Sequence, residues 1–125
     1  MRLVNADSPE SVKEYMQRVI NDENVTVTVR GAQAASPYAA TGGEHWDKLA
    51  KAVAHTWQGC LVSPYLMIAC SDSRHYAGFC EDVYKFSAMH LSTQQRGLIH
   101  NDDERIPVAE VAKTVEFFTR LEKSL

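Results

Sequence analysis

The sequence has 125 residues, of which 45% are hydrophobic, and 13 Lys and Arg residues against 16 Asp and Glu residues give a formal charge of −3 at pH 7. That length suits one domain with a modest core, or two incomplete pieces. The sequence shows no stripe of basic residues that would bind a nucleic acid and no apolar run near the ~20 residues that span a bilayer. Its N-terminal stretch lacks the apolar region of a secretory signal. We therefore expect a soluble, cytoplasmic protein with no nucleic-acid or membrane partner.

The first predicted elements are a helix and a strand. Residues 8–22 begin with Ser8 as a helix N-cap and Pro9 at the first helical position. Apolar residues then recur at helical spacing, at Val12, Tyr15, Met16, Val19 and Ile20. Residues 24–30 alternate valine with threonine, which is the period of a strand buried on one face. Together with a short strand at residues 2–4, this predicts a β-α-β unit too small to close a core by itself.

A segment rich in alanine, glycine and serine, residues 31–43, separates this unit from the rest. We place a boundary there, which gives predicted domains at residues 1–31 and 32–125. In the second domain, helical periodicity predicts a helix over 44–58 that Gly59 ends. Its inward face is predicted to consist of Trp46, Leu49, Ala50, Val53, Ala54 and Trp57.

Short apolar runs at residues 64–70 and 83–86 predict buried strands, and residues 107–125 predict a final helix. The predicted inward face of that helix consists of Val108, Val111, Ala112, Val115, Phe118 and Leu121. Helices alternating with short buried strands predict an α/β fold.

Three cysteines, Cys60, Cys70 and Cys80, recur at intervals of ten residues. Zinc-binding pairs normally lie about two to four residues apart, and an odd number argues against a disulfide framework. We therefore expect reduced, partly buried thiols.

Two loops carry clustered polar groups. The first, residues 69–78, follows the predicted strand 64–70 and contains Ser71 and Asp72. Ligands of α/β proteins bind beyond the carboxyl ends of strands, so these side chains could bind or orient a ligand. Alternatively, one of them caps a short helix and Arg74 pairs with a nearby carboxylate.

The second loop places His100 before Asp102, Asp103 and Glu104. A neutral imidazole is a common metal ligand, and carboxylates often support such a ligand through its other nitrogen. The alternative is a solvated acidic loop that favours the N-terminus of the final helix through the helix dipole. A single histidine cannot form a metal site alone.

Three stretches in this order resemble one known family. They are SPYAATGGEHWDKLAKAV (36–53), CSDSRHYAGFCEDVYKFSAM (70–89) and GLIHNDDERIPVAEVAKTVEFFTRL (97–121). The sequence is similar to the C-terminal third of the zinc-dependent amidohydrolases and peptidases that include aminoacylase, carboxypeptidase S, acetylornithine deacetylase and succinyl-diaminopimelate desuccinylase, and its carboxypeptidase S branch looks nearest. The corresponding family motifs read approximately Gly-Gly-Thr-Asp-Ser-Arg-His-Tyr, Val-Tyr-Arg-Phe and Ile-His-Gly-x-Asn-Glu-Arg-Ile.

The resemblance implies an α/β catalytic domain interrupted by a smaller lid, a four-stranded sheet with two helices that often carries dimerisation. Residues 1–31 then correspond to the second half of the lid, with Arg2 matching the arginine of an Asn-x-Arg motif. Residues 32–125 correspond to the C-terminal α/β portion of the catalytic domain. The family activity is hydrolysis of the amide bond of an N-acyl amino acid or small peptide by a water held between two zinc ions.

By the same resemblance, His100 matches the last ligand of the two-zinc site, and Glu104 matches the glutamate that follows it. Asp103 stands beside this ligand where the family has asparagine. Ser71 and Asp72 match residues that help to hold the carboxylate end of the substrate, and Arg74 follows in the same motif. These assignments imply a metal ligand and a substrate-binding loop.

The chain also departs from the family pattern. Ala69 and Cys70 replace glycines, and Asn101 stands where a glycine is usual. The other metal ligands and the general base precede the lid in the family, and nothing in residues 1–125 matches them, so the chain supplies one zinc ligand and no catalytic residue. We expect a fragment that is inactive without the missing N-terminal half. The alternative is a non-catalytic truncated paralogue or association module that forms a homo-oligomer.

Overall fold

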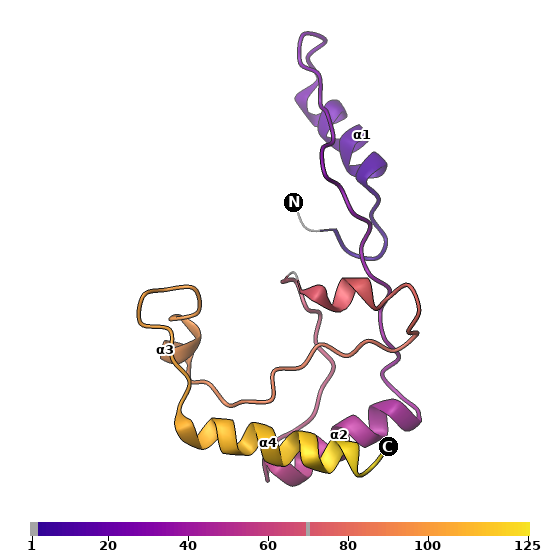
Figure 1. Ribbon diagram of the computed structural model, residues 1–125. Helices are drawn as coiled ribbons and strands as arrows, with labels where there is room; N and C mark the ends of the chain where they lie inside the picture. The colour runs from indigo at the N-terminus through magenta and orange to yellow at the C-terminus, as the bar shows by residue number, and fades with distance from the viewer. Residues whose placement is uncertain (1–2, 70) are drawn as a thin grey trace. The chain divides into compact units, whose positions relative to one another are not determined.

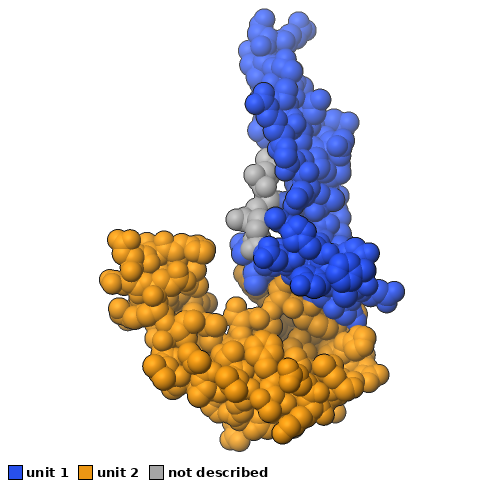
Figure 2. Space-filling model, in the orientation of Figure 1, with its two compact units in different colours: residues 1–39, 67–83 blue, residues 40–66, 84–125 orange. Residues whose placement is uncertain are grey.

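The computed structural model of the chain describes residues 3–69 and 71–125, and Arg2 and Cys70 lie outside this part (Figure 1). Its helical elements are α1 (Pro9–Ile20), α2 (Glu44–Thr56), the 3₁₀ helix η1 (Asp72–His75), α3 (Thr93–Arg96) and α4 (Val108–Glu122). The chain divides into two compact units, shown in Figure 2. Unit 1 consists of Met1–Ala39 and Met67–Val83, and unit 2 of Ala40–Leu66 and Tyr84–Leu125. The predicted domain boundary after residue 31 stays a prediction.

Helix α1 begins where the sequence predicts, because Ser8 and Ser11 form a capping box. The Ser8 hydroxyl accepts the Ser11 backbone N–H at 3.0 Å, and the Ser11 hydroxyl accepts the Ser8 backbone N–H at 3.0 Å. Each bond satisfies a backbone donor that the first helical turn leaves without a partner. Asn21 ends the helix in the left-handed conformation, with φ 48°. No residue of α1 is buried within unit 1.

The predicted strands do not form anywhere in residues 3–69 and 71–125, so the α/β prediction is confirmed only in its helices. This corrects the expected strands at 24–30 and 83–86, and those at 2–4 and 64–70 over their described residues 3–4 and 64–69. A strand is stable only when a neighbouring strand accepts and donates its backbone hydrogen bonds. Beside α1 the Gln17 side chain partly takes that role, donating to the Val25 carbonyl at 2.7 Å and accepting the Val27 N–H at 3.0 Å.

Helix α2 begins at Glu44 as predicted and ends at Thr56, slightly before the predicted end. Gly59 follows with φ 82°, a conformation that glycine adopts without the strain of a side chain. Cys60 and Cys80 are free and exposed, so the predicted partial burial is wrong for these two thiols.

The core of unit 2 forms where α2 packs against α4, which lie side by side in Figure 1. Its buried apolar residues are Ala52, Val53, Ala88 and Phe117, with Leu49, Trp57 and Leu121 packed against them. The Phe117 ring centre lies 5.1 Å from that of Phe86 and 5.7 Å from that of Trp57. Such contacts add to the free energy of burying the rings.

The face of α4 that packs inward differs from the predicted one. Phe117 is 1% exposed, whereas Phe118, predicted to be inward, is 48% exposed. Of the predicted inward set, Val108, Val111, Ala112, Val115 and Phe118 are all exposed and Leu121 is half-buried. The widest apolar stripe of the helix therefore does not face α2. The buried stripe instead follows Thr114, Phe117 and Leu121, whose spacing is also helical.

Two side chains of α4 form hydrogen bonds to the backbone of Ala88 and His90, which precede the helix in the sequence. The Thr114 hydroxyl donates to the Ala88 carbonyl at 2.6 Å, and a Glu110 carboxylate oxygen accepts the His90 backbone N–H at 2.6 Å. These bonds pair backbone groups that have no helix or sheet to satisfy them. Within the described residues, no helix is long and apolar enough to cross a membrane.

Candidate functional site

The loop predicted to bind substrate contains η1 in unit 1. Ser71 occupies the N-cap position with an extended backbone, but its side chain does not cap the helix. Its hydroxyl instead lies 2.5 Å from the Ser73 hydroxyl. Ser71 and Asp72 are both exposed, so each is accessible to a ligand. A short helix does form in this loop, but the Ser71 hydroxyl does not cap it.

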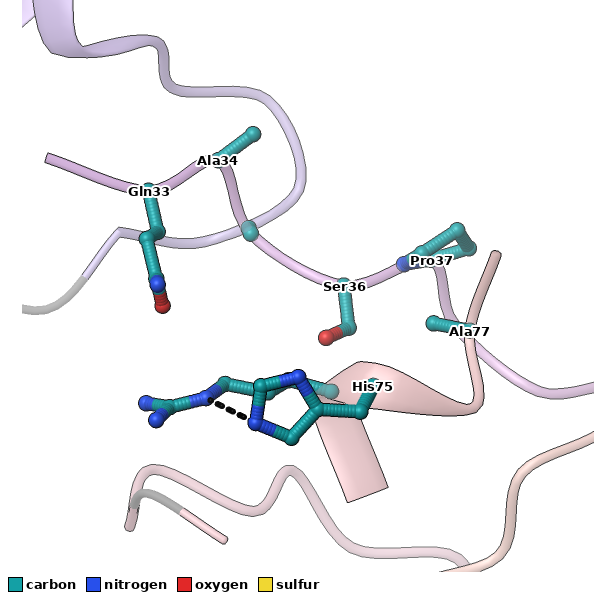
Figure 3. A pocket seen from close by; sticks show the side chains of 8 residues that line it. Gln33, Ala34, Ser36, Pro37, His75 and Ala77 are labelled. Atoms are coloured by element: carbon teal, nitrogen blue, oxygen red, sulfur yellow. Dashed lines mark hydrogen bonds between the residues drawn. The ribbon is translucent and has the colours of Figure 1, made fainter. Parts of the chain in front are cut away.

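Arg74 and His75 lie at the C-terminal half of η1 and contact each other. The Arg74 Nε–H donates to His75 Nε2 at 3.3 Å, drawn as the dashed line in Figure 3. No carboxylate of the described residues is within ion-pair distance of Arg74, so the alternative in which it pairs with a nearby acid is not realised there. Both side chains line an open hollow of unit 1, together with residues 33–37 and Ala77.

The His100 loop lies in unit 2 and follows α3, a helix not predicted from the sequence. Ser92 and Gln95 form a capping box at the start of α3. A serine three residues before a glutamine is a known signal for the start of a helix. This short helix could therefore have been predicted from the sequence. After α3, the Asn101 side-chain amide donates to the Gly97 carbonyl at 2.8 Å, which closes the turn.

His100 has a left-handed backbone, with φ 68°, a conformation that is uncommon for residues other than glycine. Its backbone N–H donates to a Glu104 carboxylate oxygen at 3.1 Å. The Glu104 side chain therefore stabilises the backbone that carries the imidazole and does not contact the ring nitrogens. Strained backbone of this kind is concentrated at functional sites, which makes the loop a candidate for one.

The acidic neighbours of His100 do not gather around its imidazole. Asp102, Asp103 and Glu104 are all exposed. Among residues 3–69 and 71–125, no group of three or more His, Cys, Asp or Glu side chains is arranged to hold a metal ion. The structure brings Glu104 to the His100 backbone and leaves Asp102 and Asp103 in solvent.

Comparison with known proteins identifies relatives over nearly the whole chain. The chain is 27% identical over 124 residues to a probable carboxypeptidase S-like protein 2 of Dictyostelium discoideum, covering 98% of the chain and 24% of that relative. It is 26% identical to the probable carboxypeptidase S-like protein 1 of the same organism, covering 96% and 25%. It is 28% identical to an N-fatty-acyl-amino acid synthase/hydrolase of Xenopus tropicalis, covering 96% and 24%.

The chain is thus a relative of carboxypeptidase S-like proteins, and the resemblance predicted from the sequence is confirmed. It spans about a quarter of the length of the curated relatives it matches. No family model and no solved structure matches it.

Proposed function

We propose that this chain is the C-terminal portion of a zinc-dependent amidohydrolase that cleaves the amide bond of an N-acyl amino acid or a small peptide. The observation that carries the proposal is the match to carboxypeptidase S-like proteins and an N-fatty-acyl-amino acid synthase/hydrolase over nearly the whole chain. Residues 1–31 would be part of the lid and residues 32–125 part of the catalytic domain, in a cytoplasmic enzyme whose N-terminal half contributes the remaining site residues.

The described residues do not fit a complete zinc centre. Zinc sites use four protein ligands, or three and a water, and no cluster of three candidate side chains occurs in residues 3–69 and 71–125. When bound, zinc would act as a Lewis acid and would lower the pKa of a coordinated water. We assign this chain one ligand, the His100 imidazole, and no catalytic residue.

Glu104 then has a definite task, which is to hold the His100 backbone. Its bond to the His100 N–H keeps that residue in the left-handed conformation that directs the side chain. Asp103 adds a negative charge on the same loop, where it favours a nearby cation. Ser71, Asp72 and Arg74 are proposed to contact the substrate, with Arg74 as the cation that attracts its carboxylate.

The deciding experiment uses the longer protein encoded by the gene, with His100→Ala compared with His90→Ala. We expect His100→Ala to lose one zinc ion per chain and nearly all hydrolysis of N-acyl amino acids, because its ligand is removed. His90 is a matched exposed histidine outside the proposed site, so His90→Ala should retain zinc and activity. Full activity with His100→Ala would reject the ligand assignment.

A second experiment concerns the 125-residue chain alone. Three carboxylates beside one imidazole on a short loop are poorly arranged to surround a tetrahedral ion, so we expect only weak, exchangeable zinc binding and no turnover. Isothermal titration after chelator treatment measures the binding. Stoichiometric sub-micromolar binding would mean that further ligands are present or that two copies share a site.

A second candidate function is favoured by the exposed apolar side chains of α1. Tyr15 and Val19 are 54% and 58% exposed, and exposed apolar patches often mark association surfaces. The chain would then be a truncated, non-catalytic paralogue that forms a homo-oligomer. The DNA upstream of Met1 discriminates the two: an open frame encoding the remaining ligands supports the enzyme, whereas a genuine start site supports the module. Light scattering that shows a strictly monomeric chain would count against the module.

A further inference from the structure

The hollow beside η1 brings together two segments of unit 1 that are distant in sequence. It has a volume of about 230 Å³. Its lining residues are Gln33, Ala34, Ala35, Ser36, Pro37, Arg74, His75 and Ala77. Half of them are small or apolar side chains, and the other half carry hydrogen-bonding groups. A hollow of this size is smaller than the pockets that enclose whole drug-sized ligands, so it suits one polar end of a ligand.

Arg74 gives the hollow a positive charge without a neutralising partner. Its Nε–H is used by His75, which leaves the two terminal NH₂ groups of the guanidinium for a ligand. No carboxylate in the described part of the chain reaches Arg74. A planar guanidinium of this kind binds a carboxylate through two parallel hydrogen bonds.

The opposite wall provides two neutral donors. In Figure 3 the side chains of Gln33 and Ser36 point toward the side of the hollow on which His75 lies. Ser36 is half-buried, and neither side chain has a hydrogen-bond partner among the described residues. A serine hydroxyl and a glutamine amide can both donate to a carboxylate.

We propose that Gln33 and Ser36 complete, with Arg74, a binding site for the carboxylate group of a small ligand. In the full-length enzyme this ligand is the N-acyl amino acid, and that identification rests on the proposed function. The free carboxylate lies between the guanidinium and the two neutral donors, and the small side chains of Ala34, Ala35 and Ala77 leave room for it. Gln33 and Ser36 therefore determine whether a substrate with a free carboxylate is accepted.

The test is an NMR titration of the ¹⁵N-labelled 125-residue chain with N-acetylalanine and with N-acetylalanine amide, which lacks the charge. We expect saturable shifts of the backbone amides of residues 33, 36, 74 and 75 with N-acetylalanine alone. Ser36→Ala and Gln33→Leu should each weaken this binding by about tenfold, which is the lower end of the effect of losing one hydrogen bond to a charged group. Ser87→Ala, at an exposed serine of unit 2, should leave it unchanged.

Three results would overturn the inference. They are equal shifts with both compounds, no saturable shift with N-acetylalanine, and an unchanged affinity for N-acetylalanine in both Ser36→Ala and Gln33→Leu. The titration needs no turnover, so it remains decisive if the proposed hydrolysis is wrong. In the full-length enzyme, Ser36→Ala and Gln33→Leu should raise the KM for N-acyl amino acids and leave kcat nearly unchanged. Normal hydrolysis with an unchanged KM in both variants would reject this inference while the proposed function stands.

Discussion

Lys113 of α4 reaches across to the end of α2, where its Nζ lies 3.3 Å from the carbonyl oxygen of Thr56. The last carbonyls of a helix have no partner within the helix and carry its negative dipole end. An ammonium group there satisfies one of them and favours the packing of α2 against α4. The Lys113 Nζ also lies 2.8 Å from Glu116 Oε2, which holds the side chain in place.

Removing this ammonium should destabilise unit 2. Lys113→Met retains most of the apolar stem, so the loss reports on the charge and its hydrogen bonds. We expect the free energy of unfolding to fall by about 1 kcal/mol, the usual size for such a bond in a partly exposed position. Urea denaturation followed by tryptophan fluorescence measures it, with Lys123→Met as the control. Equal stability of the two variants would show that the contact with Thr56 contributes nothing.

The two adjacent phenylalanines of α4 offer a sharper test of the packing. Phe117 is 1% exposed and Phe118 is 48% exposed. Phe117→Ala should cost about 3–5 kcal/mol, because it removes a buried ring and leaves a cavity beside Trp57. That is a large part of the stability of a small domain, so we expect loss of the cooperative unfolding transition.

Phe118→Ala is the matched control and should cost much less, because much of its ring is in water. The measurement is thermal unfolding followed by circular dichroism at the helical wavelengths. A larger loss for Phe118→Ala than for Phe117→Ala would mean that the originally predicted face of α4 is the one that packs inward.

The sequence predicted α1, α2 and α4 because their signals are local. Ser8 with Pro9, the glycine at 59 and Pro107 each lie next to a helix end, and the apolar periodicity between them needs no partner. Which face of α4 packs inward is not a local property, since Phe117 and Phe118 both continue an apolar stripe. Only the position of α2 decides between them.

The strand predictions were wrong, and the hollow was not predicted, for the same reason: both depend on contacts between distant parts of the chain. The valines at residues 25–29 have the period of a strand, but a strand also requires a neighbour, and Gln17 supplies only two hydrogen bonds. The candidate site loops, with Arg74 and His100, were proposed from their residue types, and these assignments stay predictions. The sequence could not indicate that Gln33 and Ser36 lie beside Arg74, because that contact joins segments far apart in the chain. Nor could it indicate the left-handed backbone of His100.

The contact between Gln17 and the 25–27 segment should be measurable by amide exchange. The Gln17 side chain accepts the Val27 N–H and donates to the Val25 carbonyl. In Gln17→Leu the Val27 amide loses its acceptor, so we expect its hydrogen exchange to become about fivefold faster, corresponding to about 1 kcal/mol. NMR-detected exchange resolves this amide. The control Gln58→Leu, at an exposed glutamine of unit 2, should leave the Val27 exchange rate unchanged. An unchanged Val27 exchange rate in Gln17→Leu would argue against the hydrogen bond between Gln17 and Val27.

The final prediction concerns acid. Hydrogen bonds from Lys113 and then from Arg120 hold the pKa of Glu116 below its ordinary value of 4.5. A carboxyl group with a lowered folded-state pKa contributes stability that is fully present above the unfolded value and is lost as the pH falls through the folded value. The contribution of Glu116 should therefore be complete well above pH 4.5 and decline progressively as the pH falls below 4.5 towards the lower folded-state pKa. The side chain is partly exposed, so salt should weaken the effect.

Glu116→Gln keeps the shape of the side chain and removes the titration. We expect the stability of this variant to fall less than that of the natural chain between pH 6 and pH 3, with the difference shrinking at high salt. Urea denaturation at several pH values measures it, and Glu122→Gln, on the same helix without an ion-pair partner among the described residues, is the control. Parallel pH profiles for the natural chain and Glu116→Gln would mean that the two cations do not hold this carboxylate in solution. A reduced pH dependence with Glu122→Gln as well would assign the effect to the net charge of α4, since both substitutions remove one negative charge.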